Sequence, residues 1–378
     1  MSSTSYRIAA LAGDGIGPEV MREAIRVLRA AEKKFEFAVE ITEAPVGWAG
    51  IDAAGKALPD ATLKLCRHAD AILFGSVGLP QRDPALPKEQ RPERAALLRL
   101  RKEFDLFANL RPVKLPKCLS HVCPLRPERQ GEGIDILVVR ELTAGLYFGP
   151  KSTEEVVDLK EAAPKPHRFR RATDTMVITT KEIERIAHVA FQNACLRRRK
   201  VTSIDKANIL ENGVLWREVV THVHGDYPEV ALEHMFVDNG AMQLLLRPSQ
   251  FDVMLCENTF GDILSDEAAA LGGSLGLLPS ASLGKARASG TFGLYEPAGG
   301  TAPDIAGKNI ANPIAQILSA ALLLRHSFKL EQAAAAIETA VEQVMVAGHR
   351  TADIYSPDEK RARKVSTSEM GSAIAASV

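Results

Sequence analysis

Two acidic residues, Asp262 and Asp266, stand four positions apart near the end of a stretch that reads FDVMLCENTFGDILSDE. In a helix, this spacing places both carboxylates on one face, about one turn apart. The stretch offers neither acid a basic partner at helical spacing, and two like charges this close are unfavourable unless a positive charge lies between them. Carboxylate oxygens are the ligands that Mg²⁺ or Mn²⁺ prefers. Spacing alone favours an ordinary solvated helix face, so the metal hypothesis depends on the rest of the chain.

The acidic pair follows a predicted buried strand, the apolar run from Phe251 to Leu255. Other apolar runs also end in charged residues, at Arg140, at Asp205-Lys206 and at Asp238. Such strands alternate with helical patterns along the chain, which predicts an α/β protein with a largely parallel sheet. These charged residues stand just after strand ends, where sheets of this kind place their sites.

Near the N-terminus, the glycine-rich segment 13–18, GDGIGP, stands between a predicted strand and a predicted helix. The arrangement is similar to a dinucleotide-binding fingerprint, but the spacing is G-x-G-x-G-P and not G-x-G-x-x-G. No acidic residue closes a second strand about 20 residues later, as that fingerprint requires. The segment therefore predicts a turn and gives little support to a Rossmann fold.

Size and composition restrict the class of protein. The chain has 378 residues, enough for two domains or one large α/β unit. Lys+Arg and Asp+Glu both number 47, and this balance argues against a nucleic-acid or membrane partner. The five cysteines form no CxxC pair, which suits a reducing compartment. With no leader-like segment and no membrane-length apolar run, we expect a cytoplasmic protein.

Several stretches, in order along nearly the whole chain, together resemble the metal-dependent β-decarboxylating dehydrogenases of 2-hydroxy acids, the isocitrate/isopropylmalate dehydrogenase family. They are residues 13–19 (GDGIGPE), 91–102, 109–112 (NLRP), 139–143 (VRELT), 205–208 (DKAN), 260–266 and 296–312. The resemblance is strongest to members that act on 3-isopropylmalate. It implies oxidative decarboxylation of (2R,3S)-3-isopropylmalate with NAD, which yields 4-methyl-2-oxopentanoate and carbon dioxide in leucine biosynthesis.

The resemblance also implies a fold of the isopropylmalate dehydrogenase type, which differs from the Rossmann fold. Two α/β domains share a continuous mixed sheet, and the active cleft lies between them. The first domain would comprise residues 1–106 and 273–378, with the cofactor loop. The second would comprise residues 107–272, with the metal ligands and the dimer interface. Family members are homodimers with active sites shared between subunits, and residues 150–175 suit an arm that interlocks across the interface.

The resemblance assigns roles to the residues that match the motifs of the family. Arginine has a fixed fork of donors that suits the two carboxylates of a 2-hydroxy diacid. The implied substrate-binding residues are Arg101, Arg111, Arg140, Leu97, Leu98 and Asp238. The implied ligands of Mg²⁺ or Mn²⁺ are Asp262 and Asp266, together with Asp238 from the partner subunit. The implied catalytic proton-transfer pair is Lys206 and Tyr147. Taken one at a time, an arginine or the lysine could be a surface charge, Tyr147 a packed aromatic ring, and the two leucines core residues.

The segment from Glu296 to Lys308 matches the cofactor loop of the family, in which small residues let the backbone approach an adenosine diphosphate. The implied NAD-binding residues are Glu93, at the nicotinamide end, and Gly300, Thr301, Ala302, Asp304, Ile305 and Asn312. Asp304 would accept hydrogen bonds from the adenosine ribose, and its charge would repel a 2′-phosphate. We therefore expect NAD to be preferred over NADP.

Other members of the family, which act on isocitrate, homoisocitrate or tartrate and malate, are the main alternative. Isocitrate enzymes bind a third carboxylate through a serine and an asparagine, whereas residues 95–98 here read AALL. Leucines beside Arg101 suit an isopropyl group, because a carboxylate there would be desolvated without a partner. A non-catalytic subunit of this fold should lack metal ligands or the lysine–tyrosine pair, and the sequence retains both sets.

Overall fold

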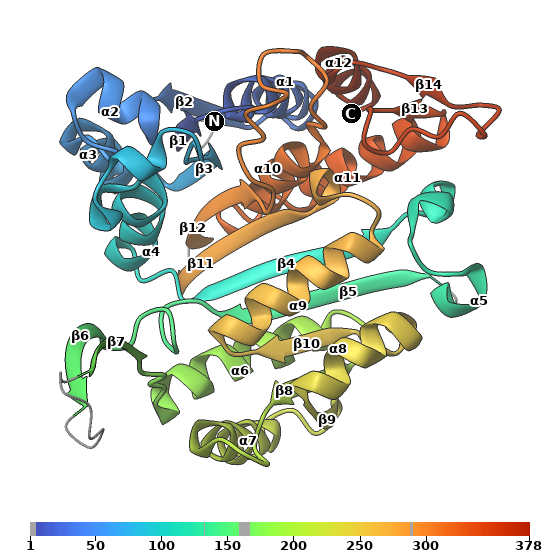
Figure 1. Ribbon diagram of the computed structural model, residues 1–378. Coiled ribbons are helices and arrows are strands. Elements are labelled where there is room, and N and C mark those ends of the chain that lie inside the picture. Colours follow the sequence, from blue (N-terminus) through green and yellow to red (C-terminus); the bar gives the residue numbers. More distant parts are fainter. Residues whose placement is uncertain (1–4, 132, 159–166, 288–289) are drawn as a thin grey trace.

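The computed structural model describes residues 5–131, 133–158, 167–287 and 290–378. Its centre is a ten-stranded sheet with helices packed against it (Figure 1). In order across the sheet, the strands are β2 (Ala38–Glu43), β1 (Ser5–Gly13), β3 (Ala71–Ser76), β12 (Gly290–Pro297), β11 (Pro279–Arg287), β4 (Ala108–Leu115), β5 (Ile134–Glu141), β10 (Val253–Cys256), β8 (Lys200–Asp205) and β9 (Ala231–Phe236). The predicted α/β fold with a continuous mixed sheet is confirmed.

Most neighbouring strands of this sheet are parallel. The antiparallel pairs are β11 with β12, β11 with β4, and β4 with β5. Strands that are covered on both faces are expected to be largely apolar, and the central strands bury long apolar runs. Ile72, Leu73 and Phe74 of β3 are wholly buried, as are Val138 and Val139 of β5. The apolar runs that predicted strands thus form the middle layer of the molecule.

Helices cover both faces of the sheet. The helices of the described residues are α1 (Gly17–Phe35), α2 (Trp48–Ala54), α3 (Asp60–His68), α4 (Arg99–Glu103), α5 (Pro127–Gln130), α6 (Thr180–Cys195), α7 (Glu211–His224), α8 (Val237–Leu246), α9 (Asn258–Leu271), α10 (Ile314–His326), α11 (Glu331–Val346) and α12 (Thr367–Ser377). Helix α9 packs on β4 and β5 and lies in front of them in Figure 1, whereas α6 lies behind the sheet. The position of α9 matters most here, because it carries the acidic pair.

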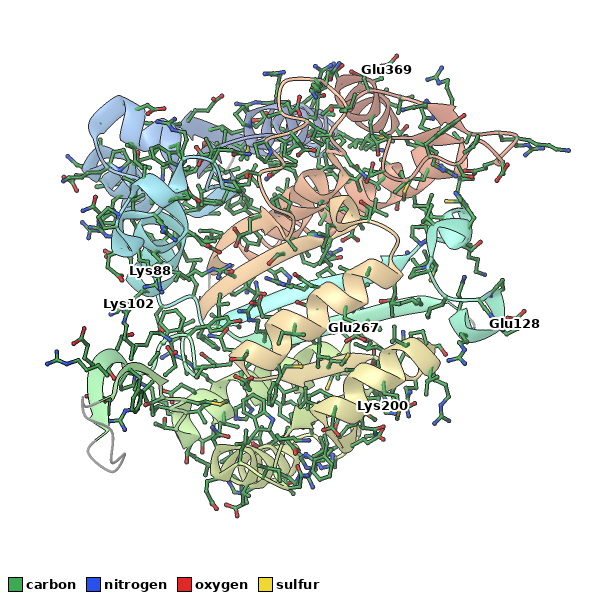
Figure 2. All side chains as sticks on the ribbon, in the orientation of Figure 1. Lys88, Lys102, Glu128, Lys200, Glu267 and Glu369 are labelled. Atoms are coloured by element: carbon green, nitrogen blue, oxygen red, sulfur yellow. The ribbon has the colours of Figure 1, made fainter. Side chains whose placement is uncertain are left out.

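The surface is charged and of mixed sign. Figure 2 shows Lys88, Glu128 and Glu369 at the outer edge of the molecule, among many other charged side chains. Among the described residues, no helix is both long enough and apolar enough to cross a membrane.

The two halves of the sheet come from different parts of the chain. Strands β1, β2, β3, β11 and β12 belong to the residues before 107 and after 272, and β4, β5, β8, β9 and β10 to the residues between. The halves meet where β11 pairs with β4, with Ala281 opposite Leu110. The division into two domains at these positions remains a prediction.

A separate antiparallel ribbon lies where the arm was predicted. It consists of β6 (Lys151–Asp158) and β7 (His167–Asp174), and it stands apart from the main sheet (Figure 1). Residues 159–166 of the predicted arm lie outside the described residues. The part that this ribbon plays between subunits stays a prediction.

The GDGIGP segment joins several elements, which explains its glycines. A Cβ atom at Gly13, where φ is +74°, would lie 2.0 Å from the backbone oxygen of Ser76 in the neighbouring strand. The carboxylate of Asp14 accepts hydrogen bonds from the backbone N–H groups of Trp48, Ala49 and Gly78 at 3.0, 3.1 and 2.8 Å. The segment is thus a structural junction, in agreement with the weak support that its spacing gave to a Rossmann fold.

Candidate active site

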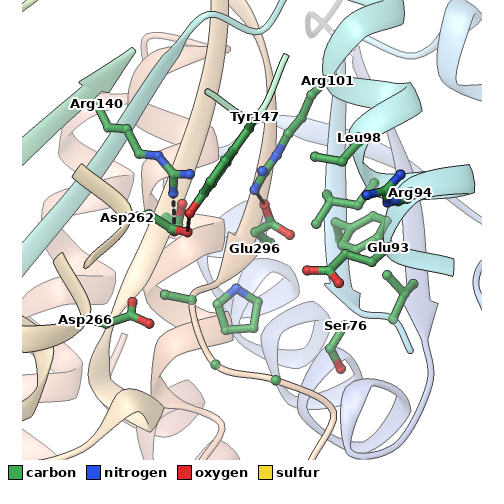
Figure 3. A pocket seen from close by; sticks show the side chains of 18 of the residues that line it. Ser76, Glu93, Arg94, Leu98, Arg101, Arg140, Tyr147, Asp262, Asp266 and Glu296 are labelled. Atoms are coloured by element: carbon green, nitrogen blue, oxygen red, sulfur yellow. Dashed lines mark hydrogen bonds and ion pairs between the residues drawn. The ribbon is translucent and has the colours of Figure 1, made fainter. Parts of the chain in front are cut away.

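The two aspartates lie on one helix, as their spacing predicted. Helix α9 begins at Asn258, and the carboxylate of Glu257 caps it by accepting hydrogen bonds from two backbone N–H groups of the first turn, at 2.9 and 2.6 Å. Such a cap satisfies donors that a first helical turn leaves free. Asp262 and Asp266 both line a cleft of about 680 Å³ (Figure 3). The helix therefore presents its acidic face to this cleft.

Arginines from two neighbouring strands supply positive charge to the acidic pair. Arg140, near the end of β5, is ion-paired with Asp262. Arg111 of β4 lies 3.1 Å from Asp266 and 3.7 Å from Asp262. Both arginines are buried. The sequence showed no basic partner because these strands are far from α9 along the chain and meet it only in the folded protein.

The charges of this cluster shift the pKa values of its members. Burial, together with the nearby charge of Arg111, lowers the pKa of Arg140 to about 10. Burial alone would raise the pKa of Asp262, but the charges of Arg140 and Arg111 outweigh burial and hold that pKa below its ordinary value. Burial raises the pKa of Asp266, because the arginine charges offset the effect of burial less at Asp266 than at Asp262. The arginines remain charged near pH 7, so the cleft offers cations to an anionic ligand.

A third buried arginine enters from the opposite side of the cleft (Figure 3). Arg101 of α4 donates from Nη2 to Oε1 of Glu296 at 2.9 Å. Its Nε is buried and has no hydrogen-bond partner within the described part of the chain. Leaving a buried donor unpaired is costly, so this N–H is a natural contact for an acceptor on a ligand.

Asn258 fixes the direction of Arg140. Its Oδ1 accepts hydrogen bonds from Nε and Nη2 of Arg140 at 3.0 and 2.7 Å. Its Nδ2 donates to two backbone carbonyl groups of the loop that leads to Tyr147. The Tyr147 hydroxyl in turn donates to Oδ2 of Asp262 at 2.9 Å, and burial and Asp262 raise the pKa of that hydroxyl. Sequence reasoning did not single out Asn258; an amide at a helix start just after a strand was the available signal.

The helical segment that carries the two leucines is not a regular α-helix throughout. Residues Glu93–Leu98 form a π-helical turn, and α-helix follows only from Arg99. In a regular α-helix, spacings of three and four residues would place Leu98 and Leu97 beside Arg101, whereas a π turn bonds residue i to i+5. The side chains reach the expected place even so. Glu93, Arg94, Leu97, Leu98 and Arg101 all line the cleft, and Arg94 had not been predicted to do so.

A second groove, of about 460 Å³, continues from the cleft along the predicted cofactor loop. Ser76, Pro297, Gly299 and Gly300 line both cavities. Of the predicted cofactor residues, Gly300, Ala302, Ile305 and Asn312 line the groove, and Glu93 lines the cleft. Thr301 is buried, and its backbone oxygen accepts a hydrogen bond from the N–H of Ile16 at 2.9 Å, so the GDGIGP junction supports this loop. Asp304 is exposed and is not among the described residues that line either cavity.

Lys206 and Asp238 lie outside the cleft of this chain. They form an ion pair with each other, Lys206 just after β8 and Asp238 in the first turn of α8. Among the described residues, no group of three or more His, Cys, Asp or Glu side chains could hold a metal ion. One chain thus brings Asp262, Asp266 and Tyr147 to the cleft, but not the other predicted metal ligand or the lysine.

The two aspartates of α9 nevertheless suit a hard divalent cation. Both offer carboxylate oxygens from successive turns of one helix, and Mg²⁺ or Mn²⁺ prefers oxygen ligands. The Asp266 side chain is 60% exposed, so a ligand in the cleft can reach it. A complete site needs further ligands from a substrate, from water or from another chain.

Comparisons with known proteins agree with this geometry. The family model for isocitrate/isopropylmalate dehydrogenase matches residues 7–374. A 3-isopropylmalate dehydrogenase of Syntrophotalea carbinolica is 58% identical over 372 residues, and one of Haemophilus influenzae is 56% identical over 371 residues; each match covers 98% of both chains. The crystal structure of isocitrate dehydrogenase from Methylococcus capsulatus is similar with a TM-score of 0.81 and 32% identity, over 98% of this chain and 99% of that one. This chain belongs to the isocitrate/isopropylmalate dehydrogenase family.

Proposed function

We propose that the protein is a metal-dependent 3-isopropylmalate dehydrogenase, which oxidises and decarboxylates its substrate with NAD in leucine biosynthesis. The observation that carries the proposal is a cleft with three buried arginines on its walls and two leucines beside one of them. This lining suits a diacid with an apolar branch. The names of the relatives at 58% and 56% identity support the same substrate.

Three arginines bind the two carboxylates of the substrate in this proposal. Arg111 and Arg140 approach from the strands, and Arg101 approaches from the opposite wall with its unpaired Nε. Charge-assisted hydrogen bonds of this kind are stronger than those between neutral groups. Leu97 and Leu98 of the same wall then pack against the isopropyl group.

Asp262 and Asp266, with Asp238 of the partner subunit, would hold Mg²⁺ or Mn²⁺. When bound, the metal would polarise the substrate hydroxyl and stabilise the negative charge that develops as carbon dioxide leaves. Charge balance also favours a divalent cation, because the substrate brings two negative charges into a cleft whose buried arginines already face carboxylates.

Two side chains move protons. Nζ of Lys206, from the partner subunit, would accept the proton of the substrate hydroxyl, and NAD, when bound, would take up the hydride. The hydroxyl of Tyr147 donates a proton to the substrate carbon that has lost carbon dioxide. The raised pKa of Tyr147 keeps this hydroxyl protonated, as a proton donor must be.

The shared active site implies a homodimer. Exposed apolar side chains on and beside α7, α8 and α9 support this arrangement; they are Ile209, Val214, Met242, Leu245 and Ile263. Exposed apolar residues gathered on neighbouring elements are typical of an interface. Helix α8 carries Asp238, and Lys206 lies shortly before α7 in the sequence. An interface on these helices would therefore bring both residues toward the cleft of a second subunit. The β6–β7 ribbon would interlock across it, and we place the dimer in the cytoplasm.

NAD occupies the groove along the cofactor loop. Its nicotinamide end lies toward Glu93 in the cleft, and its adenosine end toward Asn312. Asp304 accepts from the adenosine ribose, which requires the exposed loop to close over the cofactor. The negative charge of Asp304 would then disfavour NADP.

Absorbance of reduced nicotinamide tests the proposal directly. Purified protein with Mg²⁺ or Mn²⁺ should reduce NAD with 3-isopropylmalate at higher kcat/KM than with malate, and should use isocitrate very poorly. NADP should be the weaker cofactor, and excess chelator should abolish the reaction until metal is restored. A preference for isocitrate would reject the substrate, and full activity in excess chelator would reject the metal roles of Asp262 and Asp266.

A further inference from the structure

Glu141 is a buried carboxylate that the proposed mechanism does not use. It follows Arg140 directly as the last residue of β5, and successive side chains of a strand point to opposite faces of a sheet. Arg140 meets α9 in front of the sheet, whereas Glu141 meets Arg185 of α6 behind it (Figure 1). The Glu141 side chain is wholly buried, and 21% of the Arg185 side chain is exposed. Neither residue is among the described residues that line the cleft.

Arg185 holds Glu141 through both carboxylate oxygens. Its Nε donates to Oε2 at 3.2 Å, and its Nη2 donates to Oε1 at 2.9 Å. Burial raises the pKa of Glu141, although the hydrogen bond and charge of Arg185 act in the opposite direction. A buried ion pair is weak evidence for stability, but a two-fold contact of this kind fixes the direction of both partners. The neighbouring contacts of the pair indicate what it positions.

The pair holds the start of the tyrosine loop, residues 142–149, which carries Tyr147. The backbone N–H and the hydroxyl of Thr143 both donate to Oε1 of Glu141, at 2.9 and 3.0 Å. The hydroxyl oxygen of Thr143 also accepts a hydrogen bond from Nη2 of Arg185 at 2.6 Å. Three hydrogen bonds from the rear face of the sheet therefore fix this residue.

Asn258 holds the same loop from the cleft side. Its Nδ2 donates to the backbone oxygens of Leu142 and Ala144, at 3.1 and 2.9 Å, on either side of Thr143. The start of the loop is thus fixed from both faces of the sheet. The Tyr147 side chain is 39% exposed, so packing alone does not fix its ring, and its direction depends on the loop.

Arg185 also contacts the segment that joins α4 to β4. The carbon of its guanidinium group lies 4.4 Å from the centre of the Phe107 ring, and Nη1 lies 3.4 Å from Oδ1 of Asp105. The backbone oxygen of Phe107 accepts a hydrogen bond from the N–H of Leu142 at 2.7 Å. Helix α4 carries Arg101. One arginine therefore connects the tyrosine loop with the chain that leads from the opposite wall of the cleft.

From these contacts, and resting on the proposed function, we propose that Arg185 is a positioning residue for Tyr147. Together with Glu141 it fixes the tyrosine loop from the face of the sheet opposite the cleft. The Tyr147 hydroxyl then stays directed to the substrate carbon that it protonates. Because Arg185 touches no reacting group, its loss should harm proton transfer more than substrate binding.

Backbone hydrogen exchange, measured by mass spectrometry, tests the positioning without any turnover. In Arg185→Ala the amides of the tyrosine loop should exchange at least about five-fold faster than in the wild type, whereas those of α9 should keep their rates. Arg197→Ala is the matched control. Arg197 lies just beyond the other end of α6, its side chain is 22% exposed, and it pairs with the buried Asp252 at 2.8 Å. That variant should lose similar stability and leave the exchange of the tyrosine loop unchanged.

A second measurement tests the link to proton transfer. Reversal of the proton transfer from Tyr147 should exchange a C3 hydrogen of 4-methyl-2-oxopentanoate with D₂O, which proton NMR follows in the presence of Mg²⁺ and reduced NAD. Arg185→Ala should slow this exchange about ten-fold or more and lower kcat, with KM for 3-isopropylmalate within about three-fold of the wild type. Arg185→Lys keeps the charge beside Glu141 but lacks the fork that also reaches Thr143, so its values should lie between. Arg197→Ala should keep the wild-type values.

Different results would overturn the inference or the proposed function. Exchange of the tyrosine loop at the wild-type rate in Arg185→Ala would overturn the inference, as would an unchanged C3 exchange beside an active wild type. Equal effects of Arg185→Ala and Arg197→Ala would show a general loss of stability and would also overturn it. A wild type that neither turns over a 2-hydroxy diacid nor exchanges the C3 hydrogen would reject the proposed function, and backbone exchange would still decide whether Arg185 holds the loop.

Discussion

The three buried arginines of the cleft are matched by three carboxylates of the same chain. Arg140 faces Asp262, Arg111 faces Asp266, and Arg101 faces Glu296. A buried charge without a partner costs several kcal/mol, and the pairing avoids this cost. Added positive charge would favour the binding of a diacid in such a balanced cleft. This is the electrostatic reason to expect a divalent cation beside the substrate.

At the same scale, the two leucines of the cleft predict the preference for a branched substrate. Changing both Leu97→Ala and Leu98→Ala removes apolar contacts worth roughly 1–3 kcal/mol, or about ten- to two-hundred-fold in discrimination. We expect the double variant to narrow the preference for 3-isopropylmalate over malate, mainly by losing activity on 3-isopropylmalate. Initial rates of NAD reduction with each substrate give the ratio of kcat/KM values.

Leu100 provides a matched control for the leucine pair. It belongs to the same helical segment but is wholly buried in the core. Leu100→Ala should lower the free energy of unfolding by about 2–5 kcal/mol and leave the substrate ratio unchanged. If the Leu97/Leu98 double variant kept the full preference, the leucines would not form the substrate wall.

Some residues of the cleft could be predicted from the sequence, and others could not. The spacing of Asp262 and Asp266 placed them on one helix face, and an apolar run that ends in Arg140 pointed to a strand end. Their partners were not visible, because Asn258 is 118 positions from Arg140, and Glu296 is 195 positions from Arg101. Local spacing carries no information on contacts between residues so far apart in the sequence. The order of the strands in the sheet brings these residues together.

At the scale of elements, the π turn was the main feature that the sequence did not reveal. The segment Glu93–Leu98 is short, and its apolar residues suit an α-helix or a π-helix equally. The resemblance still selected Leu97 and Leu98, because it depended on motif positions and not on helix type. Residues 93, 94, 97 and 98 of this segment all line the cleft. π turns occur frequently at functional sites.

The junction formed by Asp14 predicts a large effect on stability. Asp14→Ala would leave the N–H groups of Trp48, Ala49 and Gly78 without their acceptor in a buried place. We expect the free energy of unfolding to fall by about 2–4 kcal/mol, as measured by chemical denaturation. Asp14→Asn keeps one acceptor oxygen and should lose less. Equal stability of Asp14→Ala and the wild type would show that water replaces the carboxylate.

Helix α10 ends at a histidine that should make stability depend on pH. Burial, with a contribution from Arg325, lowers the pKa of His326 from 6.5 to about 4. Between these values the unfolded chain binds a proton that the folded chain does not. Stability should therefore fall as the pH drops from about 6.5 toward 4, and the contribution of this residue should level off below that range.

His326→Gln tests this pH dependence, because glutamine is polar and does not titrate. The Tm of the wild type, measured from pH 7 to pH 4.5, should fall more steeply than that of the variant. Parallel curves for the two proteins would mean that the histidine has the same pKa in the folded and the unfolded chain.

At the scale of the whole molecule, the strand pattern predicted the α/β class, and the resemblance predicted the continuous mixed sheet. Neither the strand order nor the ribbon of β6 and β7 follows from periodicity alone. Lys206 and Asp238 show the limit most clearly. Both follow predicted strands as Arg140 does, yet β8 and β9 are at one edge of the sheet, and these two side chains pair with each other outside the cleft. Position after a strand end is therefore not enough to place a residue in the site of its own chain.

A shared active site predicts that two inactive variants can restore each other. Lys206→Ala and Asp262→Asn should each be nearly inactive as homodimers. A mixed dimer, purified through two different affinity tags, has one site with Lys206 from one subunit and Asp262 from the other, both intact. It should therefore show about half of the wild-type kcat per dimer. The matched control combines Asp262→Asn with Tyr147→Phe; both residues face the cleft of their own chain, so each site of that dimer keeps a defect and should stay inactive. An inactive Lys206/Asp262 mixed dimer, alongside folded and dimeric protein, would show that each chain completes its cleft without its partner.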